Sequence, residues 1–190
     1  MTGLWIALGV VGLLGLYVVV AYNRFIAQQQ SIASTWSGID VQLQRRHDLI
    51  PNLVETVKGY AAHEQQVLEA VVDARARAVN ADRDPGAGPE EQARAENILT
   101  GALRRLFAVA EGYPDLKASR NFLELQHQLT ETEDRIAAAR RLYNIEVQHY
   151  NRRLESVPSN LIAAVFGFER AAYFEIEDRA AVAAPPDTSF

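Results

Sequence analysis

NFLELQHQLTETEDRIAAARRLYNIEVQHYNRRLE, residues 121–155, decides the fold. Mostly apolar residues recur in it at spacings of three and four for more than four heptads. The seam consists of Phe122, Leu125, Leu129, Thr132, Ile136, Ala139, Tyr143, Val147, Tyr150 and Leu154. Such a seam buries one stripe of a helix against partner helices. A helix from about residue 115 to 155 is roughly 60 Å long, too long for the core of a compact globule. The stretch therefore predicts an elongated helical bundle.

Three earlier segments carry the same rhythm. The first seam consists of Tyr22, Phe25, Ile32, Trp36, Ile39, Leu43, Ile50, Leu53 and Val57, with Gln29 and Arg46 at the remaining positions. The second segment covers about 63–80 and the third about 95–113. The loop ADRDPGAGPE at 81–90 separates them, and GYPD at 112–115 is a helix stop followed by a start. Because no alternating strand pattern persists, the sequence predicts an all-α fold with an antiparallel four-helix bundle.

Pro51 leaves two assignments for the first segment. In one, a single helix runs from the N-terminal apolar run to about Lys58, bends at Pro51 and is ended by Gly59. In the other, the chain turns at Asp48, and Pro51 occupies the first turn of a new helix. We favour the bent helix, because the seam keeps its phase across the proline.

The N-terminal run LWIALGVVGLLGLYVVVA, residues 4–21, carries no charge. As a helix it rises roughly 27 Å, close to the hydrocarbon thickness of about 30 Å. A cleaved signal peptide is the alternative, but the run lacks a basic leader and exceeds the usual apolar length. We expect an uncleaved single-pass anchor in a bacterial inner membrane. The first basic residue, Arg24, follows the run, which favours an outside N-terminus and a cytoplasmic bundle.

Four antiparallel passes return the chain to the bilayer, so residues 159–177 lie at membrane height. This apolar segment either covers the end of the bundle, which we favour, or lies in the lipid interface. The expected domains are an anchor at 1–23, the bundle at 24–158, the membrane-proximal segment at 159–177 and a disordered tail at 178–190.

Composition and motifs argue against several function classes. A net charge of -5 is unlike that of a nucleic-acid binder, and the chain has no cysteine for a disulfide or thiolate site. HEQQV at 63–67 begins like a zinc-protease motif but has Val67 in place of the second histidine. No ExxH element of the di-iron type occurs. We therefore expect no cofactor, no metal and no catalytic residue.

Arg46 falls in the apolar seam and needs a partner there, because an unpaired buried charge is costly. It lies 22 residues beyond Arg24, and the same count back from Glu155 on an antiparallel fourth helix reaches Glu133. We predict a charge pairing that sets helix register. It joins Arg45 or Arg46 to Glu131, Glu133 or Asp134. Two solvated arginines are the alternative.

The dipeptide Tyr-Asn occurs three times, as Tyr22-Asn23, Tyr143-Asn144 and Tyr150-Asn151. We favour tyrosines that fill the seam and reach the membrane interface with their hydroxyls. The alternative is a partner-binding edge formed by these six residues.

The chain resembles the LemA family over about residues 20–175. The similarity lies in TWSGIDVQL (35–43), RRHDLIPNLVETVKGYAAHE (45–64), LFAVAEGYPDLKAS (106–119), NFLELQHQLTETEDRIAAARRLYN (121–144), VQHYN (147–151) and VPSNLIAAVFGF (157–168). Val157 replaces an expected aromatic residue and Thr35 an expected alanine. The resemblance implies an N-terminally anchored antiparallel four-helix bundle without established enzymatic activity, in bacterial membranes, with some members associated with membrane proteases.

These observations favour a non-enzymatic, membrane-anchored helical scaffold or adaptor for protein–protein interaction. Its expected partners are the lipid bilayer, its own copies in a homo-oligomer and other membrane proteins such as a membrane protease. The alternative is a metal- or ligand-binding sensor, or an enzyme, with its site inside the bundle.

Overall fold

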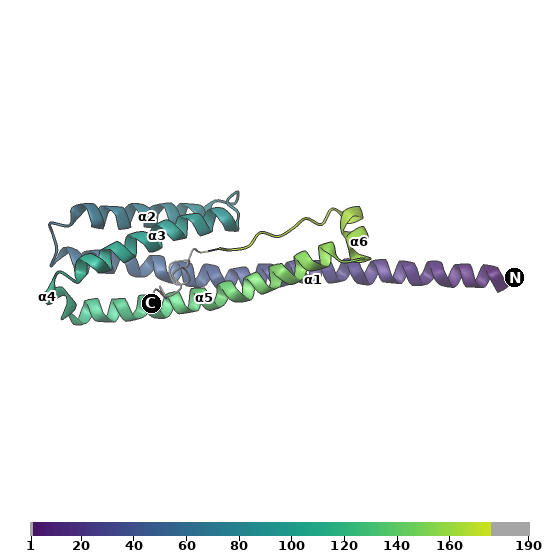
Figure 1. Cartoon of the computed structure of the whole chain (residues 1–190), viewed down its shortest axis with the longest axis horizontal. Helices are drawn as coiled ribbons and strands as arrows, with labels where there is room; N and C mark the ends of the chain where they lie inside the picture. Colours follow the sequence, from purple (N-terminus) through teal and green to yellow (C-terminus); the bar gives the residue numbers. More distant parts are fainter. Residues whose placement is uncertain (1, 176–190) are drawn as a thin grey trace, which may run out of the picture. The chain divides into compact units, whose positions relative to one another are not determined.

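The computed structural model describes residues 2–175, and every regular element among them is a helix. The elements are α1 (Thr2–Lys58), α2 (Gln65–Arg83), α3 (Pro89–Ala110), α4 (Pro114–Lys117), α5 (Arg120–Glu155) and α6 (Ser159–Phe166) (Figure 1). The all-α prediction is confirmed. The predicted tail at 178–190 lies outside the described residues, as do residues 176 and 177.

α1 continues through Pro51 and ends at Lys58. The single-helix assignment is therefore confirmed, and the alternative of a turn at Asp48 is wrong. The predicted fourth helix is divided. α4 begins with Pro114 at its first turn and ends at Lys117, and α5 starts three residues later. The break places Leu116 in the core, where it is fully buried.

The described chain forms two compact units. Unit 2 contains residues 40–137 and 173–175, so it holds the later part of α1, all of α2, α3 and α4, and the first half of α5. Its core residues are Ile50, Leu53, Val54, Val57, Ala61, Leu68, Val71, Ala74, Ala78, Leu99, Leu103, Leu106, Ala110, Leu116, Phe122 and Leu129. Short connections at 59–64 and 84–88 make successive helices antiparallel, and α2 and α3 lie side by side (Figure 1).

Unit 1 contains residues 2–39 and 138–172. In it the first part of α1 is antiparallel to the second half of α5. The Trp36 and Tyr143 rings lie 5.1 Å apart between centroids, and the Phe25 and Tyr150 rings 6.0 Å apart. α2 and α3 are too short to accompany α1 and α5 over their full lengths. Four helices therefore pack together only in unit 2, and unit 1 is a helix pair with α6.

The start of α1 exposes its apolar side chains. Its large apolar residues between Leu4 and Val20 are exposed, except for Val18, which is half-buried. Among the described helices, α1 alone is long and apolar enough to cross a membrane by length and composition. An exposed apolar helix of this length is suited to lipid rather than water.

Within unit 1, α6 and the residues after it pack on α1 beside the end of this apolar run. The Phe168 ring stacks on Phe25 at 4.7 Å, and the Phe166 ring lies 5.0 Å from Tyr22. Ala163 is buried in the same cluster. The segment therefore covers Phe25 on one side, while other side chains of α6 stay exposed.

Candidate functional site

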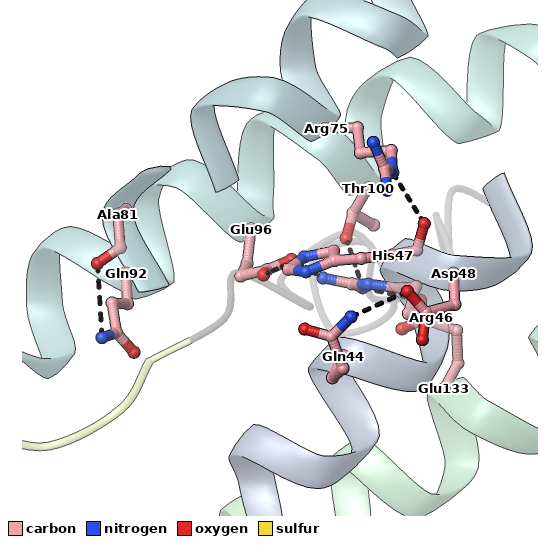
Figure 2. Close-up of polar contacts among 10 residues, drawn as sticks. All are labelled: Gln44, Arg46, His47, Asp48, Arg75, Ala81, Gln92, Glu96, Thr100 and Glu133. Carbon is pink, nitrogen blue, oxygen red and sulfur yellow. Dashed lines mark hydrogen bonds and ion pairs between the residues drawn. The ribbon is translucent and has the colours of Figure 1, made fainter. Parts of the chain in front are cut away.

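The most unusual feature of unit 2 is a buried arginine. The Arg46 side chain on α1 is 0% exposed, and its guanidinium contacts two other helices. It donates to the Glu96 carboxylate on α3 and to Glu133 Oε1 on α5, the latter at 2.6 Å. Nη1, the nitrogen that donates to Glu133, also lies 3.4 Å from Thr100 Oγ1. Figure 2 shows the guanidinium between the two carboxylates. Arg46 thus fixes three helices relative to one another within unit 2.

His47 shares the Glu96 carboxylate with Arg46. Both His47 and Glu96 are buried, and His47 Nε2 lies 2.8 Å from Glu96 Oε1. His47 Nδ1 has no hydrogen-bond partner among the described residues. This geometry fits a neutral imidazole that carries its proton on Nε2 and donates it to the carboxylate.

Pro51 explains why the Arg75 side chain contacts the backbone of His47. Proline has no N–H, so the carbonyl of His47, four residues earlier, loses its partner within the helix. The Arg75 guanidinium on α2 donates to that carbonyl, with 2.6 Å between Nε and the oxygen (Figure 2). The neighbouring helix therefore satisfies the backbone group that Pro51 leaves open, which is how α1 tolerates an internal proline.

Burial, together with the charges of Arg46 and Arg75, lowers the pKa of His47 to about 4. Asp40 in the same unit shifts the opposite way. Burial and the Asp82 carboxylate raise the pKa of Asp40 to about 6. Both groups therefore titrate between pH 4 and pH 7, with opposite effects on stability.

The lowered pKa of His47 makes the folding stability depend on pH, because the folded and unfolded chains bind different numbers of protons. Its folded pKa lies below the unfolded value, so the unfolded chain binds more protons as the pH falls through about 6.5, and stability is lost. We expect His47→Gln, which keeps a donor for Glu96, to remove this loss. The free-energy difference between wild type and His47→Gln should then change by about 2 kcal/mol between pH 7 and pH 5.

The measurement is chemical denaturation of the full-length protein in mild detergent at the two pH values. Asp40 titrates in both proteins, so its contribution cancels in the difference. A difference between the two proteins that stays constant with pH would show that His47 is not held neutral by its surroundings.

The predicted charge-pairing residues lie as follows. Arg46 and Glu133 are brought together at 2.6 Å. Arg45 Nη2 lies 3.7 Å from Glu131 Oε2, but both side chains are more than a third exposed, and such surface pairs contribute little. Among the described residues, neither arginine forms an ion pair with Asp134.

Sequence reasoning missed Glu96 and His47. α3 buries a stripe that runs through Gln92, Glu96, Leu99, Leu103 and Leu106. Ala95 and Ala102, which are also apolar, lie on the adjacent stripe and are only half-buried. Glu96 lies three residues before Leu99 and seven before Leu103, and this helical spacing indicates that it shares their buried face.

The six Tyr-Asn residues divide between buried and exposed positions. Tyr143, Tyr150 and Asn151 are buried in unit 1, whereas Tyr22 and Asn23 are exposed and Asn144 is half-buried. The burial of Tyr143, Tyr150 and Asn151 is typical of residues packed between two helices rather than of an exposed partner-binding edge.

The buried polar groups of unit 1 hold the segment after α6. Tyr143 donates its hydroxyl to the Ala172 carbonyl at 2.9 Å. The Asn151 amide exchanges two hydrogen bonds with the backbone of Ala171, at 2.9 and 3.0 Å. These contacts fix residues 171 and 172 along α5.

A family model described as the LemA family matches residues 35–190. The chain belongs to the LemA family. It is 30% identical over 180 residues to magnetosome protein MamQ 1 of Paramagnetospirillum magneticum, which covers 83% of this chain and 66% of that protein. It is 27% identical over 179 residues to magnetosome protein MamQ of Magnetospirillum gryphiswaldense, which covers 83% of this chain and 65% of the relative.

A further LemA-family relative is protein LemA of Metamycoplasma hominis, 27% identical over 156 residues, which cover 82% of this chain and 69% of that protein. The chain spans about two thirds of the length of the curated relatives it matches. None of these three carries the name of an enzyme. Together with the exposed apolar start of α1, the comparisons make the chain a membrane-associated LemA-family protein.

Proposed function

We propose that this LemA-family protein is a non-enzymatic, membrane-anchored helical scaffold whose first partner is a second copy of itself. Residues 4–21 cross the bilayer of a bacterial inner membrane. The N-terminus lies outside, and the helices after Ala21 lie in the cytoplasm. The charge distribution supports this orientation, since Arg24 follows the apolar run and no basic residue precedes it.

One observation carries the scaffold proposal. In unit 1, α5 leaves Leu142 60% exposed and Ile145 46% exposed, and Ala138 on the preceding turn is exposed as well. Spacings of four and three place these side chains on one helix face. A helix pair covers only one side of each helix, so this face is free to receive a further helix.

The buried network of unit 2 supports the same proposal. Arg46, Glu96 and Glu133 tie three helices to one register. A slipped arrangement would separate the buried guanidinium from its carboxylates, so the network disfavours other registers, as polar seam residues do in coiled coils. A scaffold benefits from a fixed register, because its exposed faces then keep a constant spacing.

The test is crosslinking of the full-length protein in membranes. We expect wild type to form a crosslinked dimer and Leu142→Glu/Ile145→Glu to weaken dimerisation by at least about 10-fold, because docking would bury unpaired carboxylates. Leu123→Glu is the matched control, since Leu123 is an exposed leucine on the same helix but in unit 2. It should dimerise like wild type.

A wild type that stays monomeric at every membrane density would contradict self-association. Capture of another membrane protein, such as a membrane protease, that is lost in Leu142→Glu/Ile145→Glu would support an adaptor with a different partner.

A further inference from the structure

A basic pocket lies where α5 ends and the chain turns into α6. It has a volume of about 330 Å³ and belongs entirely to unit 1. Its lining residues are Gln28, His149, Arg152, Arg153, Ser156 and Ser159. Two arginines at the wall of a polar pocket suit an anion, and guanidinium groups match the geometry of phosphate oxygens.

The arginines have no competing partner in the described structure. Neither Arg152 nor Arg153 forms an ion pair with a carboxylate of residues 2–175, and the nearby Glu155 is paired with Arg170 at 2.7 Å. The serine hydroxyls are already engaged. Ser156 donates to the Arg152 carbonyl, and Ser159 donates to the carbonyl of Arg153. The serines therefore hold the turn in place, and the guanidinium groups are left to recognise a ligand.

Gln28 adds an acceptor to the same wall. Its side-chain oxygen is buried and has no hydrogen-bond partner among the described residues. A buried acceptor without a partner favours a ligand that brings a hydroxyl or N–H donor. The pocket thus combines cationic groups for a phosphate with a site for a polar headgroup.

The pocket and α6 lie at the level where α1 leaves the lipid. Gln28 follows Ala21 by seven residues, a rise of about 10 Å. α6 is closer still, because the rings of Phe166 and Phe168 pack against Tyr22, at 5.0 and 5.6 Å. The headgroup layer extends roughly 5–8 Å beyond the hydrocarbon core on each side. With Ala21 at the edge of the hydrocarbon core, α6 lies within this layer and the pocket borders it.

The outer face of α6 is apolar. Leu161, Val165 and Phe166 are 63%, 77% and 48% exposed. Leu161 and Val165, four residues apart, share one face of this short helix, and Phe166 lies next to that face, where its ring also contacts Tyr22. An apolar face beside a membrane-spanning segment continues the lipid-facing surface of α1, so its occupant is the bilayer.

We propose that this pocket binds the phosphate of an anionic phospholipid while the outer face of α6 enters the bilayer interface. Arg152 and Arg153 contact the phosphate, and Gln28 accepts a hydrogen bond from the polar head. Leu161, Val165 and Phe166 lie among the first acyl carbons. The proposal requires the membrane anchor but not self-association, so the two stand or fall separately.

The test uses full-length protein in mild detergent, with lipid adducts counted by native mass spectrometry. Phosphatidylglycerol and phosphatidylcholine are the probes. We expect Arg152→Gln/Arg153→Gln to weaken phosphatidylglycerol binding about 10- to 30-fold and to leave phosphatidylcholine binding unchanged. Arg104→Gln/Arg105→Gln is the matched control, because it removes two adjacent exposed arginines from α3 in unit 2. It should bind both lipids like wild type.

Inorganic phosphate distinguishes the source of the ligand. An excess that leaves the phosphatidylglycerol adduct intact supports a lipid, whereas displacement by phosphate would overturn the lipid assignment in favour of a soluble phosphate compound. Equal binding of the two lipids by wild type, or unchanged phosphatidylglycerol binding by Arg152→Gln/Arg153→Gln, would overturn the proposal.

A second readout tests α6 itself. The chain has no cysteine, so Val165→Cys carries a spin label at a single site. In phosphatidylglycerol vesicles we expect the label to be accessible to oxygen and shielded from a water-soluble nickel complex. Leu123→Cys is the exposed control in unit 2 and should show the reverse. A label at Val165 that is fully accessible to nickel would contradict insertion of α6.

Discussion

Glu96→Ala is expected to destabilise unit 2 by about 3–5 kcal/mol, because it leaves the Arg46 guanidinium buried without its enclosed counter-ion. Glu96 also accepts from His47, so the same change removes the only described partner of the His47 Nε2 group. Glu133 stays within reach of Arg46 but compensates only in part, since its side chain is 42% exposed. The measurement is chemical denaturation of full-length protein in mild detergent, followed by far-UV circular dichroism.

Glu91→Ala is the matched control for this prediction. Glu91 lies on the same helix but is exposed, so its loss should change stability by less than about 0.5 kcal/mol. If the two substitutions lowered the free energy of unfolding equally, the burial of Glu96 would not be the reason for its contribution to stability.

The double variant Arg46→Met/Glu96→Leu separates the charge from the packing. It removes both buried charges and keeps apolar volume, so it should be more stable than Glu96→Ala alone. Effects of the two positions that simply add would mean that Arg46 and Glu96 do not act as a pair.

The helices of this protein were largely predictable from apolar spacing. The seam through Leu43, Ile50 and Leu53 kept its phase across Pro51, and α1 is continuous there. The helix can continue because Arg75, distant in sequence, donates a hydrogen bond to the His47 carbonyl that Pro51 leaves without a partner. Spacing showed that the helix continues, but it could not identify the side chain that permits it.

The charge network was predictable only in part. Counting along two antiparallel helices reached Glu133, because both lengths are measured from the membrane end and rise equally per residue. The same count cannot be made for α3, because this helix begins after a loop and is not connected directly to the apolar run at residues 4–21. Glu96 could be placed only by choosing the correct stripe of α3, and two stripes carried apolar residues.

Unit 1 departs most from the sequence-based picture. The predicted bundle covered 24–158, but α2 and α3 have only 19 and 22 residues whereas α5 has 36. The surplus of α1 and α5 forms a separate helix pair. The hydrogen bonds of Asn151 and Tyr143 to residues 171 and 172 depend on this arrangement and left no periodic signal in the sequence.

The proposed function assumes that residues 4–21 anchor the chain with the N-terminus on the outer side of the membrane. If residues 4–21 span the bilayer with the N-terminus outside, position 2 and unit 2 lie on opposite sides of the membrane. Exposed Leu142 and Ile145 then face cytoplasmic partners, and the pocket at Arg152 faces the cytoplasmic leaflet. Both proposals require this anchor, although neither depends on the other.

Labelling with a membrane-impermeant maleimide tests the topology most directly. Thr2→Cys and Asp73→Cys each introduce a single thiol into a chain that has none, and both positions are exposed. The account predicts that intact spheroplasts label Thr2→Cys fully and Asp73→Cys only after lysis. Labelling of Asp73→Cys in intact spheroplasts, or recovery of either protein in the soluble fraction, would contradict it.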